Sequence, residues 1–218
     1  MYVADMEELI PQLDSPAHLK DVKTGKYIIT NQSHAKIYGL SSSSELLGMT
    51  IHDLDCFMHK YWGNNVDEMN KIESSIINSG SSVRKNARSW LNIDGHLWVH
   101  NVIKTPIRNN LGKISAILTI TDTLNTQLPL HEIFNIYLSH YKSSQIAIIK
   151  FLEQHNILKY FIQLPTKAEL NILLTKIKLT HNKLVAQNLY ISLKTVETHM
   201  THLYQKSSDL KTVIELLS

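Results

Sequence analysis

Cysteine, glycine, proline and long apolar runs are all scarce in this sequence, and each absence excludes a class of protein. The 218 residues contain one cysteine, Cys56, so a disulfide within the chain and a cysteine-rich zinc framework are excluded. Seven glycines and five prolines are too few for a collagen-like chain. The longest apolar runs, such as residues 115–120 and 146–149, are far shorter than the ~20 residues that span a bilayer. We therefore expect no membrane partner.

Targeting and catalytic motifs are missing as well. The first eight residues carry acidic side chains where a secretory signal carries Lys or Arg before an apolar stretch, so we expect a cytoplasmic protein. The sequence has no glycine-rich phosphate loop, no HExxH and no GxSxG, and no pair of carboxylates suggests catalysis. We therefore do not expect an enzyme.

Length and charge divide the chain into a larger and a smaller part. At ~150 residues per domain, 218 residues suit one full domain and a smaller module. Residues 1–125 contain 12 Lys and Arg against 13 Asp and Glu, a net charge of −1. Residues 126–218 contain 10 against 6, a net charge of +4. The excess positive charge favours an anionic partner for the C-terminal part.

Turn signals predict an antiparallel sheet in the first part. A turn at residues 23–26 separates two short strands, Asp94-Gly95 is a strong hairpin signal, and residues 109–112 form a third turn. Short helical stretches lie between the first two hairpins, at residues 32–38, 43–47 and about 64–78. The pattern predicts two strands, then helices, then three strands.

The first part resembles the PAS sensor family over about half of the chain. The resemblance rests on the order and spacing of short motifs: Lys20-Asp21-Val22, Gly25-Lys26-Tyr27, Asn31, Tyr38-Gly39, residues 45–50, Trp98, Pro106-Ile107, Gly112 and Asp122-Thr123. It implies an α+β fold for residues 1–125, in which a five-stranded antiparallel sheet and its helices enclose a pocket for a small molecule, or present a surface to a partner.

Aromatic residues are the candidate lining of that pocket. Planar side chains stack on planar ligands, and polar side chains orient them. The candidates are Tyr38, Trp62, Trp90 and Trp98 as stacking surfaces, with Asn31 or His96 as polar anchors. The sequence identifies no cofactor, and flavin photochemistry is disfavoured because Cys56 lacks the Asn-Cys-Arg context of flavin-reactive sensors.

Residues 126–163 have the periodicity of helices. Pro129 suits a first helical turn, and apolar side chains follow at 4-3-4 spacing from Leu130 to Tyr141. We interpret this segment as a helical connector, either for dimerisation or for packing on a neighbouring domain.

Residues 164–218 contain the pattern of a helix-turn-helix. A helix from Thr180 or Asn182 to about Leu189 is followed by a two-residue link, and Ser192 is a good N-cap for a second helix to about Lys206. Apolar residues of the second helix share one face and leave a polar face toward solvent. A DNA major groove accepts a helix of this kind.

The string from Asn182 to Lys206 resembles the LuxR-type helix-turn-helix, and its most specific part is the run Ile191-Ser-x-Lys-Thr-Val-x-x-His199. Thr166, Glu169 and residues 172–173 resemble the preceding helix, which implies an all-α four-helix domain over residues 164–218. Three positions depart from the family pattern: a glycine is missing near Leu179, Ser207 replaces a core leucine, and an acid, Glu197, replaces a basic residue.

The resemblance implies a bacterial transcription regulator that binds double-stranded DNA as a homodimer. Residues Lys183, Lys194, Thr195 and His199 would position the phosphate backbone. Glu197, Thr198 and Thr201 would face the base edges, and His202 belongs to the same exposed face. Two alternatives stay open: a receptor of the acyl-homoserine-lactone type, and a protein-interaction module without DNA binding.

Twelve histidines require that a metal site be considered. His96 and His100 would share one face of a strand, and His199 and His202 lie one helical turn apart. Neither pair has an evident third ligand in the sequence, so we predict no metal site.

Overall fold

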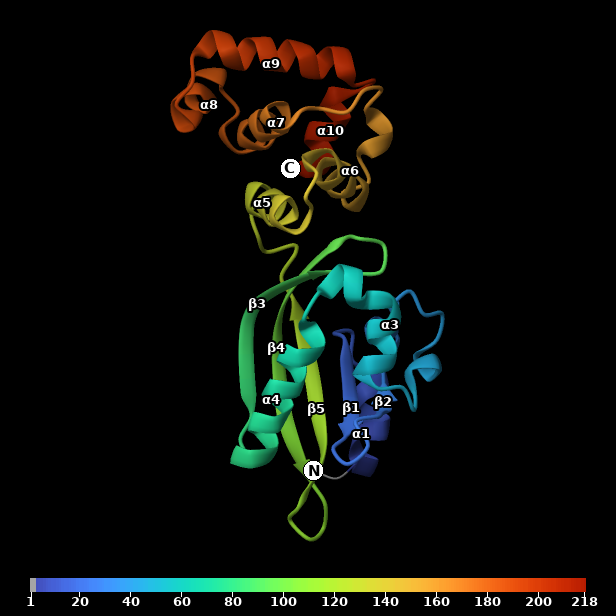
Figure 1. Ribbon diagram of the computed structural model, residues 1–218. Coiled ribbons are helices and arrows are strands. Elements are labelled where there is room, and N and C mark those ends of the chain that lie inside the picture. The colour runs from blue at the N-terminus through green and yellow to red at the C-terminus, as the bar shows by residue number, and fades with distance from the viewer. Residues whose placement is uncertain (1–2) are drawn as a thin grey trace. The chain divides into compact units, whose positions relative to one another are not determined.

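The computed structural model describes residues 3–218, drawn in Figure 1. The chain folds as two compact units, of which the first ends at Thr126 and the second runs from Gln127 to Ser218. The second unit includes the residues that the sequence assigns to a connector. Within the described residues, no helix combines the length and hydrophobicity needed to cross a membrane.

The first unit is built on a five-stranded antiparallel sheet, as the sequence predicts. Strands lie side by side in the order β2-β1-β5-β4-β3, so the first strand pairs with the last. The predicted turns at 23–26, 94–95 and 109–112 connect β1 to β2, β3 to β4 and β4 to β5. The strands are β1 (Ala17–Asp21), β2 (Tyr27–Thr30), β3 (Val83–Leu91), β4 (Leu97–Arg108) and β5 (Ile114–Thr123).

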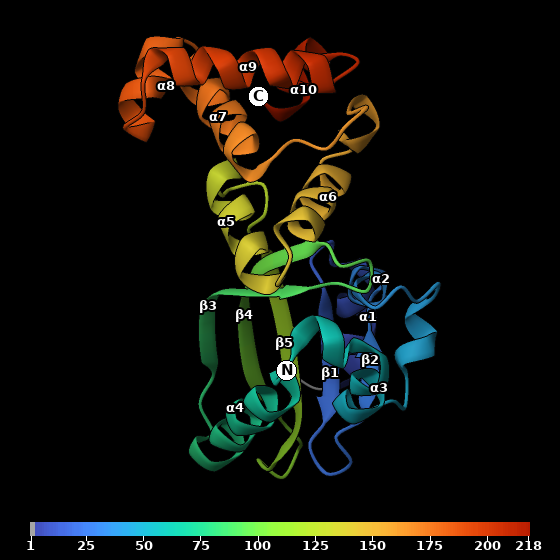
Figure 2. The ribbon, with the colours of Figure 1, turned by 45° about the horizontal axis from the view of Figure 1, so that its top comes forward.

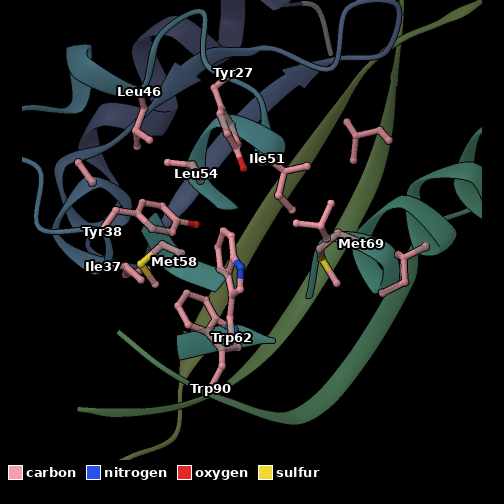
Figure 3. Close-up of a cluster of buried hydrophobic side chains, with 14 of the residues drawn as sticks. Tyr27, Ile37, Tyr38, Leu46, Ile51, Leu54, Met58, Trp62, Met69 and Trp90 are labelled. Atoms are coloured by element: carbon pink, nitrogen blue, oxygen red, sulfur yellow. The ribbon is translucent and has the colours of Figure 1, made fainter. Parts of the chain in front are cut away.

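Helices cover both faces of this sheet. One face packs against α2 (Gln32–Ile37), η2 (Ser43–Leu46), α3 (Ile51–Trp62) and α4 (Asn65–Ser79), around the cluster of apolar side chains in Figure 3. The opposite face packs against Met6 of α1 (Val3–Leu9) and Ile10 of η1 (Ile10–Gln12). Two separate cores result, and the first is the larger.

Helix α3 is absent from the sequence-based prediction. Thr50 caps it, since its hydroxyl accepts a hydrogen bond from the Asp53 backbone N–H and the Asp53 carboxylate accepts one from the Thr50 backbone N–H. Ile51, Leu54 and Met58 share its buried face. The single cysteine, Cys56, is exposed on this helix.

The second unit is all helical. It contains α5 (Leu130–His140), α6 (Ser144–Gln154), η3 (Leu158–Tyr160), α7 (Lys167–Leu179), α8 (Asn182–Leu189), α9 (Leu193–Lys206) and α10 (Leu210–Leu217). Helices α5 and α6 lie next to each other (Figure 2). The rings of Phe134 and Tyr137 on α5 contact the ring of Phe151 on α6. The last four helices, α7 to α10, form the four-helix domain that the sequence predicts.

Candidate functional site

A small cavity lies between the first core and the inner face of the sheet. Its volume is about 50 Å³, several times the roughly 10–15 Å³ that one water needs. All four aromatic residues predicted from the sequence line it: Tyr38, Trp62, Trp90 and Trp98. Figure 3 shows Tyr38, Trp62 and Trp90 close together.

The indole nitrogens of the three tryptophans differ in their partners. Trp62 Nε1 donates to Asp55 Oδ1 at 2.6 Å, and Trp98 Nε1 donates to Thr123 Oγ1 at 3.0 Å. Trp90 Nε1 is buried and has no hydrogen-bond partner within the described residues. A buried donor without a partner is costly, so this N–H is available to an acceptor that enters the cavity.

The two polar anchors predicted from the sequence require correction, because neither lines the cavity. Asn31 is the N-cap of α2: its Oδ1 accepts from the backbone N–H groups of His34 and Ala17, and its Nδ2 donates to the backbone oxygens of Leu13 and Ser15. His96 lies in the β3–β4 hairpin, where its backbone N–H donates to Asn92 Oδ1. Asn31 therefore joins chain segments and His96 belongs to a turn.

A buried group of charges that was not predicted from the sequence lies beside the cavity. Glu73 of α4 accepts from Lys20 Nζ at Oε2 and from Lys104 Nζ at Oε1, both at 2.8 Å. Lys104 Nζ also donates to Thr119 Oγ1 at 3.1 Å. The sequence carries no signal for this burial, because a lysine that alternates with apolar residues along a strand ordinarily faces solvent.

Three buried histidines also line the cavity: His18, His34 and His100. Desolvation by burial, with a smaller contribution from Lys104, lowers the pKa of His34 to about 3. Burial, with a contribution from Arg88, lowers the pKa of His100 to about 3. Both rings are therefore neutral at physiological pH, and the buried Nδ1 atoms of His18 and His100 have no partner in the described part of the chain.

Acidification should destabilise the first unit because these histidines resist protonation when folded. Their pKa rises to ~6.5 on unfolding, so stability is complete above that pH and is lost as the pH falls toward 3. At pH 5, His34 and His100 should each lower the free energy of unfolding by about 2 kcal/mol relative to pH 7.5.

Urea denaturation followed by tryptophan fluorescence measures this loss, since all three tryptophans lie in the first unit. His59→Ala provides a control, because His59 is exposed. A free energy of unfolding that is equal at pH 7.5 and pH 5 would contradict the expectation.

The helix-turn-helix has the boundaries that the sequence predicts. Ser192 caps α9, accepting a hydrogen bond at its Oγ from the Thr195 backbone N–H at 3.0 Å. Tyr190 ends α8 in the left-handed region, with φ 54°. On α9, Val196, Met200 and Leu203 are buried, which fixes the opposite face toward solvent.

Most of the predicted DNA-facing residues are exposed on this module. Lys183 on α8 is exposed, and so are Lys194, Glu197, Thr198, Thr201 and His202 on α9, whereas Thr195 and His199 are half-buried. The hydroxyls of Thr198 and Thr201 donate to the backbone oxygens of Lys194 and Glu197, at 2.9 and 3.0 Å. The helix uses the hydroxyl hydrogens, so the two threonines offer a partner their methyl groups and the lone pairs of the hydroxyl oxygens.

Residues 166–207 match the family "Bacterial regulatory proteins, luxR family". The C-terminal module is a luxR-type helix-turn-helix domain. The match extends from the N-cap of α7 to the residue after α9. None of the curated proteins matches the chain.

Several solved structures are similar to the chain at low identity. A Vibrio cholerae VqmA–ligand–DNA complex is 19% identical, with 99% of this chain and 86% of that chain covered and a TM-score of 0.49. The VqmA dimer of Vibrio cholerae in the absence of target DNA is 18% identical, with coverages of 99% and 87% and a TM-score of 0.47. The PAS domain of a Colwellia psychrerythraea protein is 14% identical, with coverages of 57% and 98% and a TM-score of 0.44.

Two departures from the luxR-type pattern have structural consequences. Thr180 follows α7 with φ 51°, in the region that favours glycine, which is where the sequence lacks the expected glycine. Ser207 is buried, and its Oγ has no hydrogen-bond partner within residues 3–218. Ser207 therefore affects the interior, whereas Thr180 is an exposed residue whose effect is on the backbone at the end of α7. Neither replacement lies on the solvent-facing surface of α9.

The histidine pair of the luxR-type module has a third neighbour that the sequence did not reveal. Donor atoms of Glu169, His199 and His202 lie within 4.8 Å of one another. The expectation that this pair lacks a third ligand is therefore wrong.

Proposed function

We propose that this protein is a dimeric, sequence-specific DNA-binding transcription regulator that acts in the bacterial cytoplasm. The observation that carries the proposal is the luxR family match of residues 166–207 on a helix-turn-helix with a solvent-facing polar helix. Residues 164–218 carry 7 Lys against 4 acids, which is little charge for one small domain on a polyanion. Two modules double the contacts, which is why we propose a homodimer.

Within the module, we assign the contacts that position the DNA phosphate backbone to α8 and the start of α9. We assign recognition of the base sequence to the middle of α9. Lys183 and Lys194 are exposed cations for phosphates, while Thr195 and His199 flank them. Glu197 accepts from a cytosine amino group, and the methyls of Thr198 and Thr201 contact thymine methyls. His202 lies at the end of this surface.

We propose that the first unit is the sensor and that its cavity takes a compact planar ligand. The walls are aromatic, and Trp90 Nε1 offers an unused donor in a cavity of about 50 Å³. A ligand of one ring therefore requires small shifts of the lining side chains. The chemical class of the ligand distinguishes this proposal from a receptor of the acyl-homoserine-lactone type. Mass spectrometry of ligands extracted from the purified protein identifies that class.

The roles on α9 are tested with two substitutions. Lys194→Ala should weaken binding to all DNA alike, because a phosphate contact carries no sequence information. Glu197→Lys should raise non-specific affinity and remove about 1–3 kcal/mol of discrimination at one base pair, because the acceptor for the base amino group is lost. The measurement compares both variants on the best site and on scrambled DNA at one salt concentration.

Two outcomes would contradict the proposal. If Lys194→Ala affected only the best site and Glu197→Lys left the specificity ratio unchanged, the roles would be wrong. If the wild-type chain bound no DNA at low salt, the module would instead be a protein-interaction surface.

A further inference from the structure

We propose that Glu169, His199 and His202 form a binding site for a divalent transition-metal ion of the zinc class. Glu169 lies in the first turn of α7, and both histidines lie on α9, so the ion would join two helices of the same module. The proposal goes beyond DNA binding and does not depend on it.

The three side chains have donor atoms to spare. Glu169 Oε2 is occupied, since it accepts from the Thr166 backbone N–H at 2.7 Å and from Lys206 Nζ at 2.8 Å. Glu169 Oε1 faces His202 Nδ1 at 3.5 Å. The Nδ1 atom of His199 is buried and has no hydrogen-bond partner in the described part of the chain.

The distances suit a tetrahedral ion after small side-chain rotations. Zinc bonds of 2.0–2.2 Å to nitrogen and oxygen place neighbouring ligands roughly 3.3 Å apart. The Glu169–His202 separation of 3.5 Å is already close to this value, and all three donors lie within 4.8 Å. A fourth position is left for water.

The donor set selects the class of ion. Imidazole nitrogen favours zinc, copper or nickel over magnesium and calcium, which take oxygen ligands. Lys206 is the positively charged group that would repel a cation at this site. It contacts Glu169 Oε2, whereas the ion would bind Glu169 Oε1. Glu169 is buried with its pKa held below the ordinary value: desolvation raises it, but the hydrogen bonds from Lys206 and Thr166 outweigh that effect.

The ion would fix α9 against α7. Glu169 is held by its capping hydrogen bonds, whereas the His202 side chain is half exposed and free to turn toward it. A bond from the metal to each of them replaces the loose 3.5 Å contact with a rigid one. We therefore expect zinc to raise the thermal stability of the second unit.

Isothermal titration of the full-length protein with zinc chloride, without DNA, tests the site. The wild type should bind one tight equivalent, and His202→Ala should weaken that binding by at least about 100-fold, because losing a ligand costs more than the 10–100-fold lost when a residue that supports the ligands is removed. His199→Ala should do the same. Cobalt(II) provides a second readout, because the intense visible absorption of a tetrahedral cobalt site should be lost in His202→Ala.

His59→Ala is the matched control. His59 also lies beside a carboxylate, with Nδ1 at 3.2 Å from Asp55 Oδ2, but among residues 3–218 it is not part of a three-ligand group. Zinc affinity should be unchanged in this variant. The proposal is overturned if the wild type binds no tight zinc, if His202→Ala binds zinc as tightly as the wild type, or if the loss occurs in His59→Ala. Since His202 is exposed at the helix surface, its replacement leaves the fold intact for the comparison.

Discussion

Raising the salt concentration from ~50 to ~200 mM should weaken DNA binding by about 150-fold. The exposed cations assigned to phosphates are Lys183 and Lys194, so a dimer brings four of them to the duplex. Each neutralised phosphate releases counterions and contributes about −0.9 to the slope of log affinity against log salt, which gives about −3.6. Fluorescence anisotropy with a labelled duplex at several salt concentrations measures the slope.

The same slope reports the number of modules that bind. A single module would give about −1.8 and a loss of only about 12-fold over the same range. Lys183→Ala should reduce the magnitude of the dimer's slope by about 1.8, while Lys211→Ala should leave it unchanged, since Lys211 lies on α10 beside Glu215. An affinity independent of salt would contradict the DNA-binding assignment.

Removing Glu73 should be among the most destabilising substitutions in the first unit. Glu73→Ala leaves the ammonium groups of Lys20 and Lys104 buried without their common carboxylate, at 5% and 4% side-chain exposure. Breaking a buried ion pair from one side costs about 3–5 kcal/mol of the free energy of unfolding. Urea denaturation followed by tryptophan fluorescence measures this loss.

The neighbouring glutamate on α4 provides a matched control. Glu68 Oε2 accepts from Arg88 Nη2 at 2.8 Å, but the Glu68 side chain is 52% exposed and Arg88 keeps its bond to Asn65 Oδ1. Glu68→Ala should therefore cost about 1 kcal/mol or less. Equal losses in the two variants would show that burial does not distinguish the two ion pairs.

High pH provides a second check on Glu73. Burial already lowers the pKa of Lys104 in the wild type, although Glu73 opposes that shift. In Glu73→Ala the folded protein favours the neutral form of the buried lysines, because their carboxylate partner is gone. The loss in the free energy of unfolding should therefore be full at neutral pH and shrink as the pH approaches the unfolded-state lysine pKa of ~10.4.

The elements that were predicted correctly are those with local signals. Ser192 starts α9 through a hydrogen bond to a residue three positions away, and Asp94-Gly95 folds a hairpin within a few residues. Helix α3 had an equally local signal, the capping box of Thr50 and Asp53 before Ile51 and Leu54, and its omission was an error of interpretation.

By itself, the sequence determined the two-part organisation, the sheet and its hairpins and the polar face of α9, because turns, caps and periodicity act between residues near in the chain. The aromatic residues that line the cavity were predicted from the resemblance to the PAS family. The tertiary structure alone decided which distant polar groups meet. Asn31 became a structural cap, Glu73 joined lysines 53 and 31 positions away, and Glu169 approached His202 from another helix. Such pairings depend on how strands and helices pack, and no spacing along the chain encodes them.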